Sequence, residues 1–518
     1  MVRAAIGVAV LLLASGCTTP EALPAPTFTA VDGVGHTYAG GFNFFVGGGV
    51  AAFDCNQDRM PDLFLAGGEG PSTLLVNRSL PGEIDFEEAV GTEPMNGVTG
   101  AYPIDLDSDG LLDLAVLRFG ENVLLRGLGD CRFERANELW SFDGGAEWTT
   151  AFSAQWTDGG FPDIALGNYL VVVEDENRRD DWTCDDNTLL DGMSDGFGPA
   201  TALQPSHCAL SLLFTDWDGS GAADLRVSND RHYYVDGQEQ LWDLGGPAPS
   251  EFTADDGWRR LEIWGMGIAS RDVTGDGLPD YVLTSQGDNK LQTLADGTSR
   301  PLFTDIAIRR GTTAHRPHVG DDIRPSTAWH PEFGDVNNDG LADLFLAKGN
   351  VEAQPDHATE DPNNLLLGQL DGTFVEGAAD AGIAHMDRTR GAALVDLDLD
   401  GRLDLVEVNR ETPTRVWRNE GDAGRWLQVW LDQPGGNPNA VGARVEVSDG
   451  ETTWMVDHLI GGGHGGDQQG WIHFGVGSAR SVEVRVTWPD GSVGEWVETG
   501  TDRFVEVSRA SGLNEWTP

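Results

Sequence analysis

Seven short segments of the chain place carboxylate or other polar side chains at alternate positions. One of them, DLDSDGLLD from Asp105 to Asp113, has Asp at positions 1, 3, 5 and 9 and Gly at position 6. Short oxygen-bearing side chains on alternate residues of a tight loop can converge on one cation, and Gly permits the sharp turn. Calcium suits such a loop better than magnesium, which demands stricter octahedral geometry and keeps its waters. The pattern therefore predicts calcium sites.

Six copies keep most of the predicted ligands, so about six calcium ions are expected. At positions 1, 3, 5 and 9 these copies have Asp54, Asn56, Asp58 and Asp62; Asp105, Asp107, Asp109 and Asp113; Asp216, Asp218, Ser220 and Asp224; Asp272, Thr274, Asp276 and Asp280; Asp335, Asn337, Asp339 and Asp343; and Asp396, Asp398, Asp400 and Asp404. The seventh copy has Gln155, Thr157, Gly159 and Asp163 at these positions, and it is expected to bind no ion.

Ligand content ranks the six loops. The loops that begin at Asp105 and Asp396 have four carboxylates and a Gly, so we expect them to bind calcium most tightly. Arg59 stands at the Gly position of the first loop, where it adds a positive charge and backbone strain, and Ser220 is a weaker neutral ligand. The alternative is that these segments are solvated Asp-Gly turns. We disfavour it because position 9 is Asp in all six copies.

The spacing of the loops predicts the elements that position them. First positions fall at residues 54, 105, 155, 216, 272, 335 and 396, a period of 50 to 63 residues that is typical of a β-propeller blade. Small or apolar runs precede each loop and β-rich segments such as DLFLA follow it, so each loop joins two strands of a hairpin. An EF-hand would need flanking helices and a Glu at position 12. We therefore predict an all-β, seven-bladed propeller.

A second repeated element is an aromatic residue that begins the outer strand of each blade. Copies occur at Phe86, Phe133, Phe197, Phe252, Phe303 and Phe374. None follows the last acidic loop, but PTFTAV, which contains Phe28, precedes the first. We infer that residues 26–31 supply the outer strand of the last blade, which would close the ring without an open edge strand.

The N-terminus has the features of an export signal. A short cationic start precedes an apolar stretch, Ala4 to Ala14, that is too short to span a bilayer. The following ASGC resembles a bacterial lipobox, which implies cleavage before Cys17 and acylation of its thiol. We therefore expect a signal peptide over residues 1–16, a Pro-rich tether over 17–25, and an exported chain anchored at an outer membrane or cell surface. The alternative is an ordinary secretory signal with a chance cysteine.

Four further cysteines are available for disulfides in an exported chain: Cys55, Cys131, Cys184 and Cys208. Four cysteines allow three pairings. Cys184 and Cys208 lie in one irregular segment, so we favour that bridge, which leaves Cys55 to pair with Cys131. Four reduced thiols are the alternative.

The acidic loops, together with NNLLLGQLDGTFVEGAADAGI (residues 363–383), resemble the FG-GAP/VCBS repeats of integrin-type propellers. The tail from Arg425, with RWLQVWLD, NAVGARVEVSDG and VEVRVTWPDGS, is similar to the ASPIC/UnbV domain. Together they resemble the cartilage-acidic-protein family. The resemblance implies a calcium-binding propeller over residues 26–423, a β-sandwich-like domain over 424–510 and a tail over 511–518. It also implies a binding or adhesive module rather than an enzyme. One departure is HGGDQQGWIHFG (residues 464–475), whose role is left open.

Composition narrows the possible partners. The chain has 33 Lys and Arg against 84 Asp and Glu, a formal charge of -51, which disfavours nucleic acid and anionic membrane surfaces. Contact with a membrane is therefore expected only through the lipid anchor. A protein or glycan ligand is expected instead, on the propeller face that carries the long insertions near residues 174–210 and 309–331.

The Walker A and H-E-x-x-H motifs are missing from the chain. His315, His318 and His330 form the richest histidine cluster and could bind a transition metal, although a polar insertion explains them as well. The alternatives to a binding module are a calcium-dependent carbohydrate-active enzyme, which could use these histidines, and a purely structural envelope component.

Overall fold

The computed structural model describes residues 25–90, 94–157, 160–171, 182–230, 237–295, 297, 299–351, 354–421 and 423–518. The predicted signal peptide, Cys17 and nearly all of the tether lie outside the described residues, as does Gly159 of the seventh loop. The described part of the chain contains no helix that is both long and apolar enough to span a bilayer.

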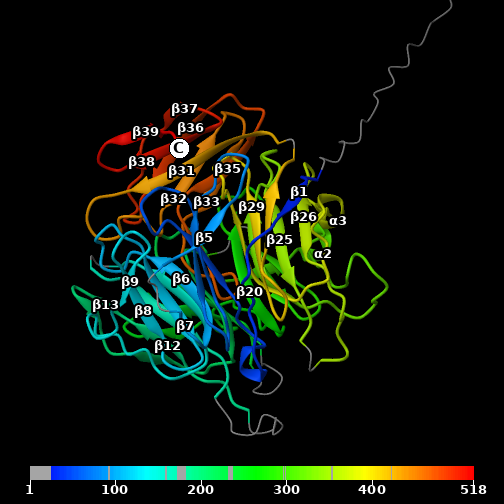
Figure 1. Cartoon of the computed structure of the whole chain (residues 1–518). Coiled ribbons are helices and arrows are strands. Elements are labelled where there is room, and N and C mark those ends of the chain that lie inside the picture. Colours follow the sequence, from blue (N-terminus) through cyan, green and yellow to red (C-terminus); the bar gives the residue numbers. More distant parts are fainter. Residues whose placement is uncertain are drawn as a thin grey trace, which may run out of the picture.

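Seven antiparallel sheets form a ring, so the predicted propeller is confirmed (Figure 1). The innermost strand of each sheet contacts the innermost strands of both neighbours, and the ring closes between the last blade and the first. From the axis outward, blades 1 to 4 contain β2 (Val50–Phe53), β3 (Asp62–Leu65), β4 (Thr73–Asn77) and β5 (Phe86–Glu88); β6 (Val98–Ile104), β7 (Asp113–Arg118), β8 (Val123–Gly127) and β9 (Phe133–Arg135); β10 (Thr149–Gln155), β11 (Asp163–Asn168), β12 (Asn187–Leu190) and β15 (Thr201–Leu203); β16 (Ala209–Thr215), β17 (Asp224–Asn229), β18 (Gln240–Asp243) and β19 (Ser250–Glu251).

Blades 5 to 7 repeat the arrangement, and two short helices follow outer strands. The strands are β20 (Gly265–Arg271), β21 (Asp280–Ser285), β22 (Lys290–Leu294) and β23 (Phe303–Asp305); β24 (Ala328–Gly334), β25 (Asp343–Lys348), β26 (Asn364–Gly368) and β27 (Phe374–Glu376); β28 (Thr389–Val395), β29 (Asp404–Asn409), β30 (Arg415–Asn419) and β1 (Phe28–Val31). The helices are α2 (Ala307–Arg310), α3 (Ala378–Ala381) and the 3-10 helix η1 (Phe42–Phe44).

The outer strand of blade 7 comes from the beginning of the described chain. β1 pairs antiparallel with β30, with Phe28 opposite Asn419 and Val31 opposite Val416. Phe28 is buried in a cluster that includes Trp417 of β30. This pairing covers the edge that β30 would otherwise expose.

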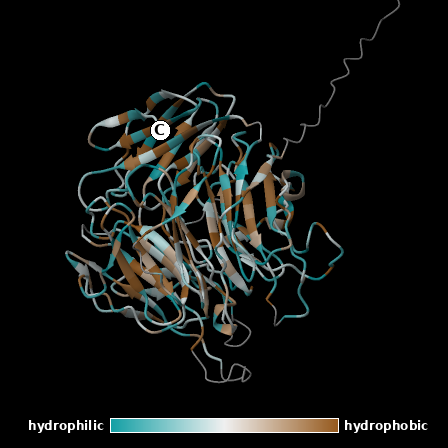
Figure 2. Ribbon diagram, in the orientation of Figure 1, coloured by the Kyte–Doolittle hydropathy of each residue, from teal (hydrophilic) through white to brown (hydrophobic). Residues whose placement is uncertain are grey.

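Hydrophobic residues gather on the strands, and hydrophilic residues on the loops that connect them (Figure 2). The aromatic residue begins the outer strand in β5, β9, β23 and β27, as predicted, but in blade 4 Phe252 follows β19 and does not begin it. In blade 3 this prediction is wrong: Phe197 lies in a separate two-stranded sheet, β13 (Gly192–Met193) with β14 (Gly196–Phe197). β15 is the outer strand there, because the longer segment between β12 and β15 first forms this extra hairpin.

The two faces of the ring differ in the connections that they carry. The acidic loops join the first and second strands of each blade, so all of them lie on one face, called here the acidic face. Connections between second and third strands, and from each blade to the next, lie on the opposite face, called here the connection face. Two long connections of this kind, residues 306–327 and 349–363, therefore lie away from the acidic loops.

The C-terminal part of the chain is a β-sandwich that covers the acidic face (Figure 1). Its two sheets enclose one apolar core. In sheet order, they contain β35 (Ile472–Gly477), β31 (Arg425–Asp432), β38 (Arg503–Ser508) and β39 (Gly512–Trp516); and β33 (Thr453–Asp457), β32 (Arg444–Ser448), β36 (Ser481–Thr487) and β37 (Val497–Gly500). The prediction of a tail over residues 511–518 is wrong, because β39 pairs with β38 and extends the sheet.

A Gly-rich loop of this sandwich, residues 458–470, enters the propeller axis and is called here the plug. Its strand β34 (Gln468–Gln469) pairs in parallel with β2 of blade 1. Four further bridges join it to the innermost strands of blades 2 to 5: Gly466 with Ala101, Ile460 with Ala154, Gly461 with Leu213, and Gly463 with Ile268. The sequence left the role of this segment open, and the structure assigns it to filling the axis.

Glycine permits the close approach of the plug to the blades. A Cβ atom added at Gly49 of blade 1 would lie 1.7 Å from the carbonyl oxygen of Gly465. At the tip of the plug, His464 is completely buried and its ring lies 5.0 Å from that of Trp329. The imidazole accepts a hydrogen bond from the Gly47 N–H and contacts the Met266 carbonyl oxygen at 3.1 Å. His464 is therefore a structural residue, and its burial lowers its pKa to about 3.

Candidate metal centres

The acidic loop of blade 2 is folded by its own first carboxylate. Asp105 accepts hydrogen bonds from the backbone N–H groups of Asp109 at 3.1 Å and Gly110 at 2.9 Å. Gly110 has a φ of 86°, which the turn requires and which glycine adopts without strain. The same two bonds fold the loop of blade 7, from Asp396 to the N–H groups of Asp400 and Gly401.

Two loops bring three carboxylates together. One oxygen from each of Asp105, Asp107 and Asp113 lies within 4.8 Å of the others, and the same holds for Asp396, Asp398 and Asp404. Oδ1 of Asp107 and Oδ1 of Asp398 are buried without a hydrogen-bond partner among the described residues. Buried anionic oxygen without a partner is costly, and a hard cation with oxygen ligands would satisfy it. These donor sets fit a metal ion.

Crowding of the carboxylates opposes their ionisation. Burial and the neighbouring carboxylates raise the pKa of Asp105 to about 7, although backbone N–H groups oppose the shift. The same causes raise the pKa of Asp335 in blade 6 to about 8, and they raise the pKa values of Asp396 and Asp404 well above the usual range. A bound cation would reverse this effect by favouring the charged carboxylates.

The carboxylate at position 9 has a structural role in every blade. In blade 2, Asp113 accepts the N–H of Leu106 at 2.7 Å and that of Gly127 at 2.8 Å, which ties the loop to the end of β8. The degenerate loop of blade 3 keeps this link, because Asp163 accepts the N–H of Gly192 at 2.8 Å. The constant Asp at position 9 is therefore explained without calcium. Its presence in all six copies does not distinguish a calcium site from a solvated Asp-Gly turn.

An arginine lies against each of the two loops that have four carboxylates. Arg126 of β8 donates from Nε to Asp107 and from Nη2 to Asp109, both at 2.7 Å. At the equivalent position of β30, Arg418 contacts Asp398 at 2.8 Å and Asp400 at 3.2 Å. Sequence reasoning missed both arginines because their contacts depend on cross-strand register. These two loops were predicted to bind calcium most tightly because they have a fourth carboxylate. Each guanidinium offsets the charge of that fourth carboxylate.

The other predicted loops adopt the same turn without gathering three carboxylates within that distance. Backbone hydrogen bonds to the first carboxylate occur at Asp54, Asp216, Asp272 and Asp335. In blade 6, Oδ2 of Asp339 is buried and has no partner among the described residues. The remaining predicted ligands lie in these turns: Asn56, Asp58 and Asp62 in blade 1; Asp218, Ser220 and Asp224 in blade 4; Thr274, Asp276 and Asp280 in blade 5; Asn337 and Asp343 in blade 6.

Arg59 has the positive φ, 70°, that its place in the loop requires. Its side chain points away from the loop carboxylates toward the sandwich, where it forms a 2.7 Å ion pair with Glu506. The guanidinium also lies 3.9 Å from the ring centre of Trp430. The positive charge that was expected to weaken this loop is therefore used in docking the sandwich.

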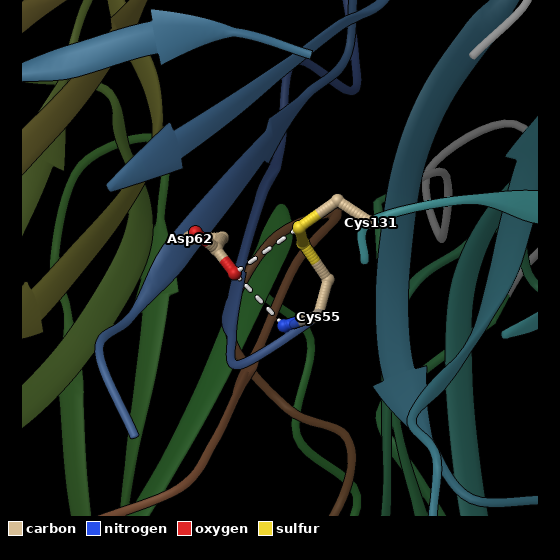
Figure 3. Close-up of side chains that lie close together, drawn as sticks. All are labelled: Cys55, Asp62 and Cys131. Carbon is tan, nitrogen blue, oxygen red and sulfur yellow. Dashed lines mark hydrogen bonds between the residues drawn. A yellow bond between two sulfur atoms is a disulfide. The ribbon is translucent and has the colours of Figure 1, made fainter. Parts of the chain in front are cut away.

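Two disulfides are present, Cys55 to Cys131 and Cys184 to Cys208, and both favoured pairings are confirmed. The first joins the acidic loop of blade 1 to the turn between β8 and β9 of blade 2. Figure 3 shows Asp62 beside this bridge, accepting the Cys55 N–H at 2.8 Å and contacting Cys131 Sγ at 3.6 Å. Because both sulfur atoms are in the disulfide, these three residues form a covalent brace rather than a metal site.

The three predicted histidines do not converge. His315 lies 2.5 Å from Asp288, and His318 lies 3.6 Å from Glu376. His330 lies instead at the propeller axis, where its Nδ1 accepts the N–H of His464 in the plug at 3.0 Å. This arrangement gives no common site for a transition metal or for catalysis.

The sandwich contacts the acidic loops of several blades. The backbone N–H of Asn437 donates to Ser108 in blade 2, and Arg444 donates to the carbonyl oxygen of Gly277 in blade 5. Trp454 donates to the carbonyl oxygen of Gly340 in blade 6 at 2.7 Å, and Gln428 donates directly to the carboxylate of Asp396 in blade 7. The candidate metal loops are therefore part of a domain interface.

Comparison with protein families identifies both parts of the chain. The FG-GAP-like repeat model matches residues 54–116, 272–346 and 335–407, and the ASPIC and UnbV model matches residues 433–514. The chain is 26% identical to cartilage acidic protein 1 of Mus musculus over 235 residues, which are 44% of this chain and 34% of the mouse protein. The human protein gives the same identity over 235 residues, 44% of this chain and 33% of that protein.

Two solved structures share the general architecture at low similarity. BBS1N in complex with ARL6DN has a TM-score of 0.44 and 9% identity, and the match covers 76% of this chain and 97% of that one. An Agrocybe aegerita lectin that recognises non-reducing terminal N-acetylglucosamine has a TM-score of 0.37 and 16% identity, covering 72% and 92%. Both TM-scores are below 0.5, so these similarities say nothing about the function of this chain.

The match to the curated relatives spans about a third of their length. The chain carries FG-GAP-like repeats and an ASPIC and UnbV segment, and it is distantly similar to cartilage acidic protein 1.

Proposed function

We propose that the chain is an exported, lipid-anchored, calcium-binding propeller that acts as a binding or adhesion module for a protein or glycan. The observation that carries this proposal is that the sandwich occupies one face of the propeller and leaves the other face uncovered. The sandwich covers the acidic face, and the plug fills much of the axis. The connection face thus remains as the broad surface on which a partner can bind.

Calcium is the ion that best suits the acidic loops. Their donors are carboxylate oxygens in flexible turns, and buried oxygen atoms of Asp107, Asp339 and Asp398 have no partner among the described residues. In the proposal, Asp105, Asp107, Asp109 and Asp113 hold the ion in blade 2, and Asp396, Asp398, Asp400 and Asp404 hold it in blade 7. The ions hold the hairpins and the docked sandwich in place, and they take no part in a reaction.

The connection face is the proposed site of partner binding because the long connections lie there. Residues 306–327 form one such connection, in which Ile323 is 77% exposed. A Cβ at Gly320 would lie 3.5 Å from Met386, itself 41% exposed, so this connection lies against the segment that precedes β28. The other long insertion predicted from the sequence lies near residues 174–210. Residues 172–181 lie outside the described residues.

Anchoring through Cys17 completes the proposal, with the Pro-rich segment as a spacer between the membrane and the propeller. Metabolic labelling with a palmitate analogue would test it directly. Label incorporated into the wild-type chain but not into a Cys17→Ser variant would support the anchor. Equal labelling of the two proteins, or none in either, would rule it out.

A binding screen tests the module itself. The soluble chain without residues 1–17 would be presented to a glycan array and to envelope proteins, with calcium and after chelation. We expect a ligand whose binding falls at least tenfold in Ile323→Asp, on the connection face. The matched control is Val493→Asp, which alters a 60% exposed residue of the sandwich and should leave binding unchanged. Loss of binding only in the control variant would place the ligand on the sandwich instead.

A further inference from the structure

The plug leaves part of the propeller axis unfilled. Its backbone bridges run along the innermost strands of blades 1 to 5. Beside it, a cavity of about 220 Å³ that is partly open to solvent is lined by the plug, by blades 4, 5, 6, 7 and 1, and by the sandwich strands β31, β33 and β35. At roughly 30 Å³ for each water molecule, the cavity has room for about seven waters. A molecule the size of one sugar ring would occupy a similar space.

Arg271, the last residue of β20, lines this cavity. Its guanidinium group forms no hydrogen bond or ion pair with another described residue. Its side chain is partly buried, and Asp335, Asp457 and Asp272 attract it only from beyond ion-pair distance. A guanidinium group has five N–H donors, and a buried charge without a partner is costly. The cavity is therefore expected to contain a group that accepts hydrogen bonds from Arg271.

Two other residues of the lining have unmatched polar atoms. His473 contacts the Gly401 carbonyl oxygen through Nε2 at 3.3 Å, while its Nδ1 is buried without a partner among the described residues. Nε2 of Gln469 is also buried without a hydrogen-bond partner. Burial lowers the pKa of His473 to about 4, so the ring is neutral near pH 7 and its Nδ1 is an acceptor. The lining thus offers both donors and acceptors.

The charges around the cavity disfavour a charged ligand. Glu332 accepts hydrogen bonds from Gln468 at 2.8 Å and from the Leu394 N–H at 3.0 Å, and its carboxyl group lies beside the cavity. Asp467, whose pKa is raised to about 7 by burial, lines the cavity as well, together with Asp54, Asp396 and Asp457. An anionic ligand would meet these carboxylates, and a cationic ligand would meet Arg271. Hydroxyl groups donate and accept at once, so a neutral polyhydroxylated molecule can satisfy both.

Apolar surface completes the lining. Ile268, Leu394, Trp430 and Trp471 contribute to it, so the cavity combines a few polar groups with aromatic and aliphatic walls. This composition is common in small-molecule sites, where polar groups fix the orientation of the ligand and the apolar walls contact its carbon skeleton. The C–H faces of a sugar ring match such walls.

We propose that this cavity is a binding site for a small, neutral, polyhydroxylated molecule such as a monosaccharide, with Arg271 as its principal hydrogen-bond donor. Arg59 also lines the cavity, and its side chain is 30% exposed. The Arg59–Glu506 ion pair is worth at most about 1 kcal/mol at such exposure, and its opening provides a route of entry. The proposal rests neither on the partner-binding face nor on the lipid anchor.

Calorimetry on the full chain with calcium tests the proposal. D-Glucose, D-galactose and N-acetyl-D-glucosamine are the probes, and sodium acetate and L-alanine are charged and zwitterionic comparators. We expect one saturable site for at least one sugar and at least tenfold weaker binding in Arg271→Gln. The matched control is Arg415→Gln, which removes a guanidinium paired with Asp387 and leaves sugar binding unchanged.

The melting temperature of the same variant separates ligand binding from a structural role. Because Arg271 has no hydrogen-bond or ion-pair partner among the described residues, Arg271→Gln should melt at or above the wild-type temperature without sugar and should lose the stabilisation by sugar. Failure of all three sugars to bind, binding only of the comparators, or sugar binding unchanged by the substitution would each overturn the proposal.

If Arg271→Gln does not fold, a crystal structure of the wild-type chain grown with the sugar decides the question. Density for a sugar ring within hydrogen-bond distance of Arg271 supports the site. Ordered water alone in the cavity overturns it. Neither outcome bears on the partner-binding face, so this proposal and the proposed function can fail separately.

Discussion

The acidic loop of blade 2 and the degenerate loop of blade 3 are built on the same hairpin but carry different side chains. Asp113 and Asp163, at position 9, each accept a backbone hydrogen bond from the chain at the end of the third strand. Positions 1 and 3 are Asp105 and Asp107 in blade 2, whereas blade 3 has Gln and Thr there. The hairpin survives this loss. Position 9 therefore maintains the blade, and positions 1, 3 and 5 are free to serve a cation.

The same pair of loops shows how the protein balances charge. Blade 2 has four loop carboxylates and Arg126 against two of them. Blade 7 repeats the arrangement with Arg418. In blade 2, one guanidinium against four carboxylates gives the same net charge as three carboxylates alone, and in blade 7 Arg402 adds a second guanidinium against Asp400. A carboxylate count alone is therefore a poor guide to affinity, and the expectation that these two loops bind most tightly stays a prediction.

Removal of calcium should have the largest effect. Each ion that binds only the folded loop adds about 2.7 kcal/mol to the free energy of unfolding at 100 times its dissociation constant. With about six ions, chelation should lower the melting temperature by more than about 10 °C, as measured by calorimetry with and without chelator. An unchanged melting temperature would show that the acidic loops are solvated turns, no different in kind from the loop of blade 3.

Substitution at position 9 should destabilise even the loop that lacks ligands. Asp163→Ala removes the acceptor of the Gly192 N–H and should cost about 1–3 kcal/mol, equally with and without calcium. In the matched variant Asp107→Asn, the cost should appear only when calcium is present. Urea unfolding in both conditions measures the two effects. A calcium-dependent cost in Asp163→Ala would contradict the structural role of position 9.

The stabilisation by calcium should depend on pH. In the folded, metal-free protein the pKa of Asp105 is about 7, compared with the ordinary value of 3.8. Between pH 3.8 and about 7, the folded chain therefore keeps a proton on Asp105 that the unfolded chain has released. The free energy of unfolding of the metal-free protein should therefore fall as the pH rises from about 4 to about 7. Calcium favours the ionised carboxylates, so it should raise the melting temperature more at pH 7.5 than at pH 5. Equal gains at both pH values would contradict this.

The smallest expected effect concerns the arginine. Arg126→Gln removes a cation that competes for Asp107 and Asp109. A partly exposed ion pair is worth roughly 0.2–1 kcal/mol, so calcium affinity of that loop should rise by at most about fivefold. Calcium titration of this variant and of Arg418→Gln would measure it, with Arg415→Gln as a control. Weaker calcium binding would instead mean that the arginine organises the carboxylates for the ion.

Local patterns predicted most of the fold. Loop spacing identified the seven blades, and the extra aromatic strand at Phe28 indicated how the ring closes. The plug could not be predicted, because nothing in a Gly-rich sequence states which distant strands it will contact. Arg126 and Arg418 were missed for a related reason. Both lie on the third strand of a blade, and only the register of strand pairing brings them to the acidic loop. The outer strand of blade 3 was misplaced because Phe197 lies in an added hairpin with the same local appearance.

Ring closure sets an order of events during synthesis. Phe28 must wait for Asn419, 391 residues later, before β1 can pair, and Ala52 meets Gln468 of the plug later still. Contacts so distant in sequence form slowly, and unpaired strand edges favour aggregation. A nascent chain that stops short of the plug would have seven blades and no completed axis. The last fifth of the polypeptide therefore decides whether the ring that precedes it can finish folding.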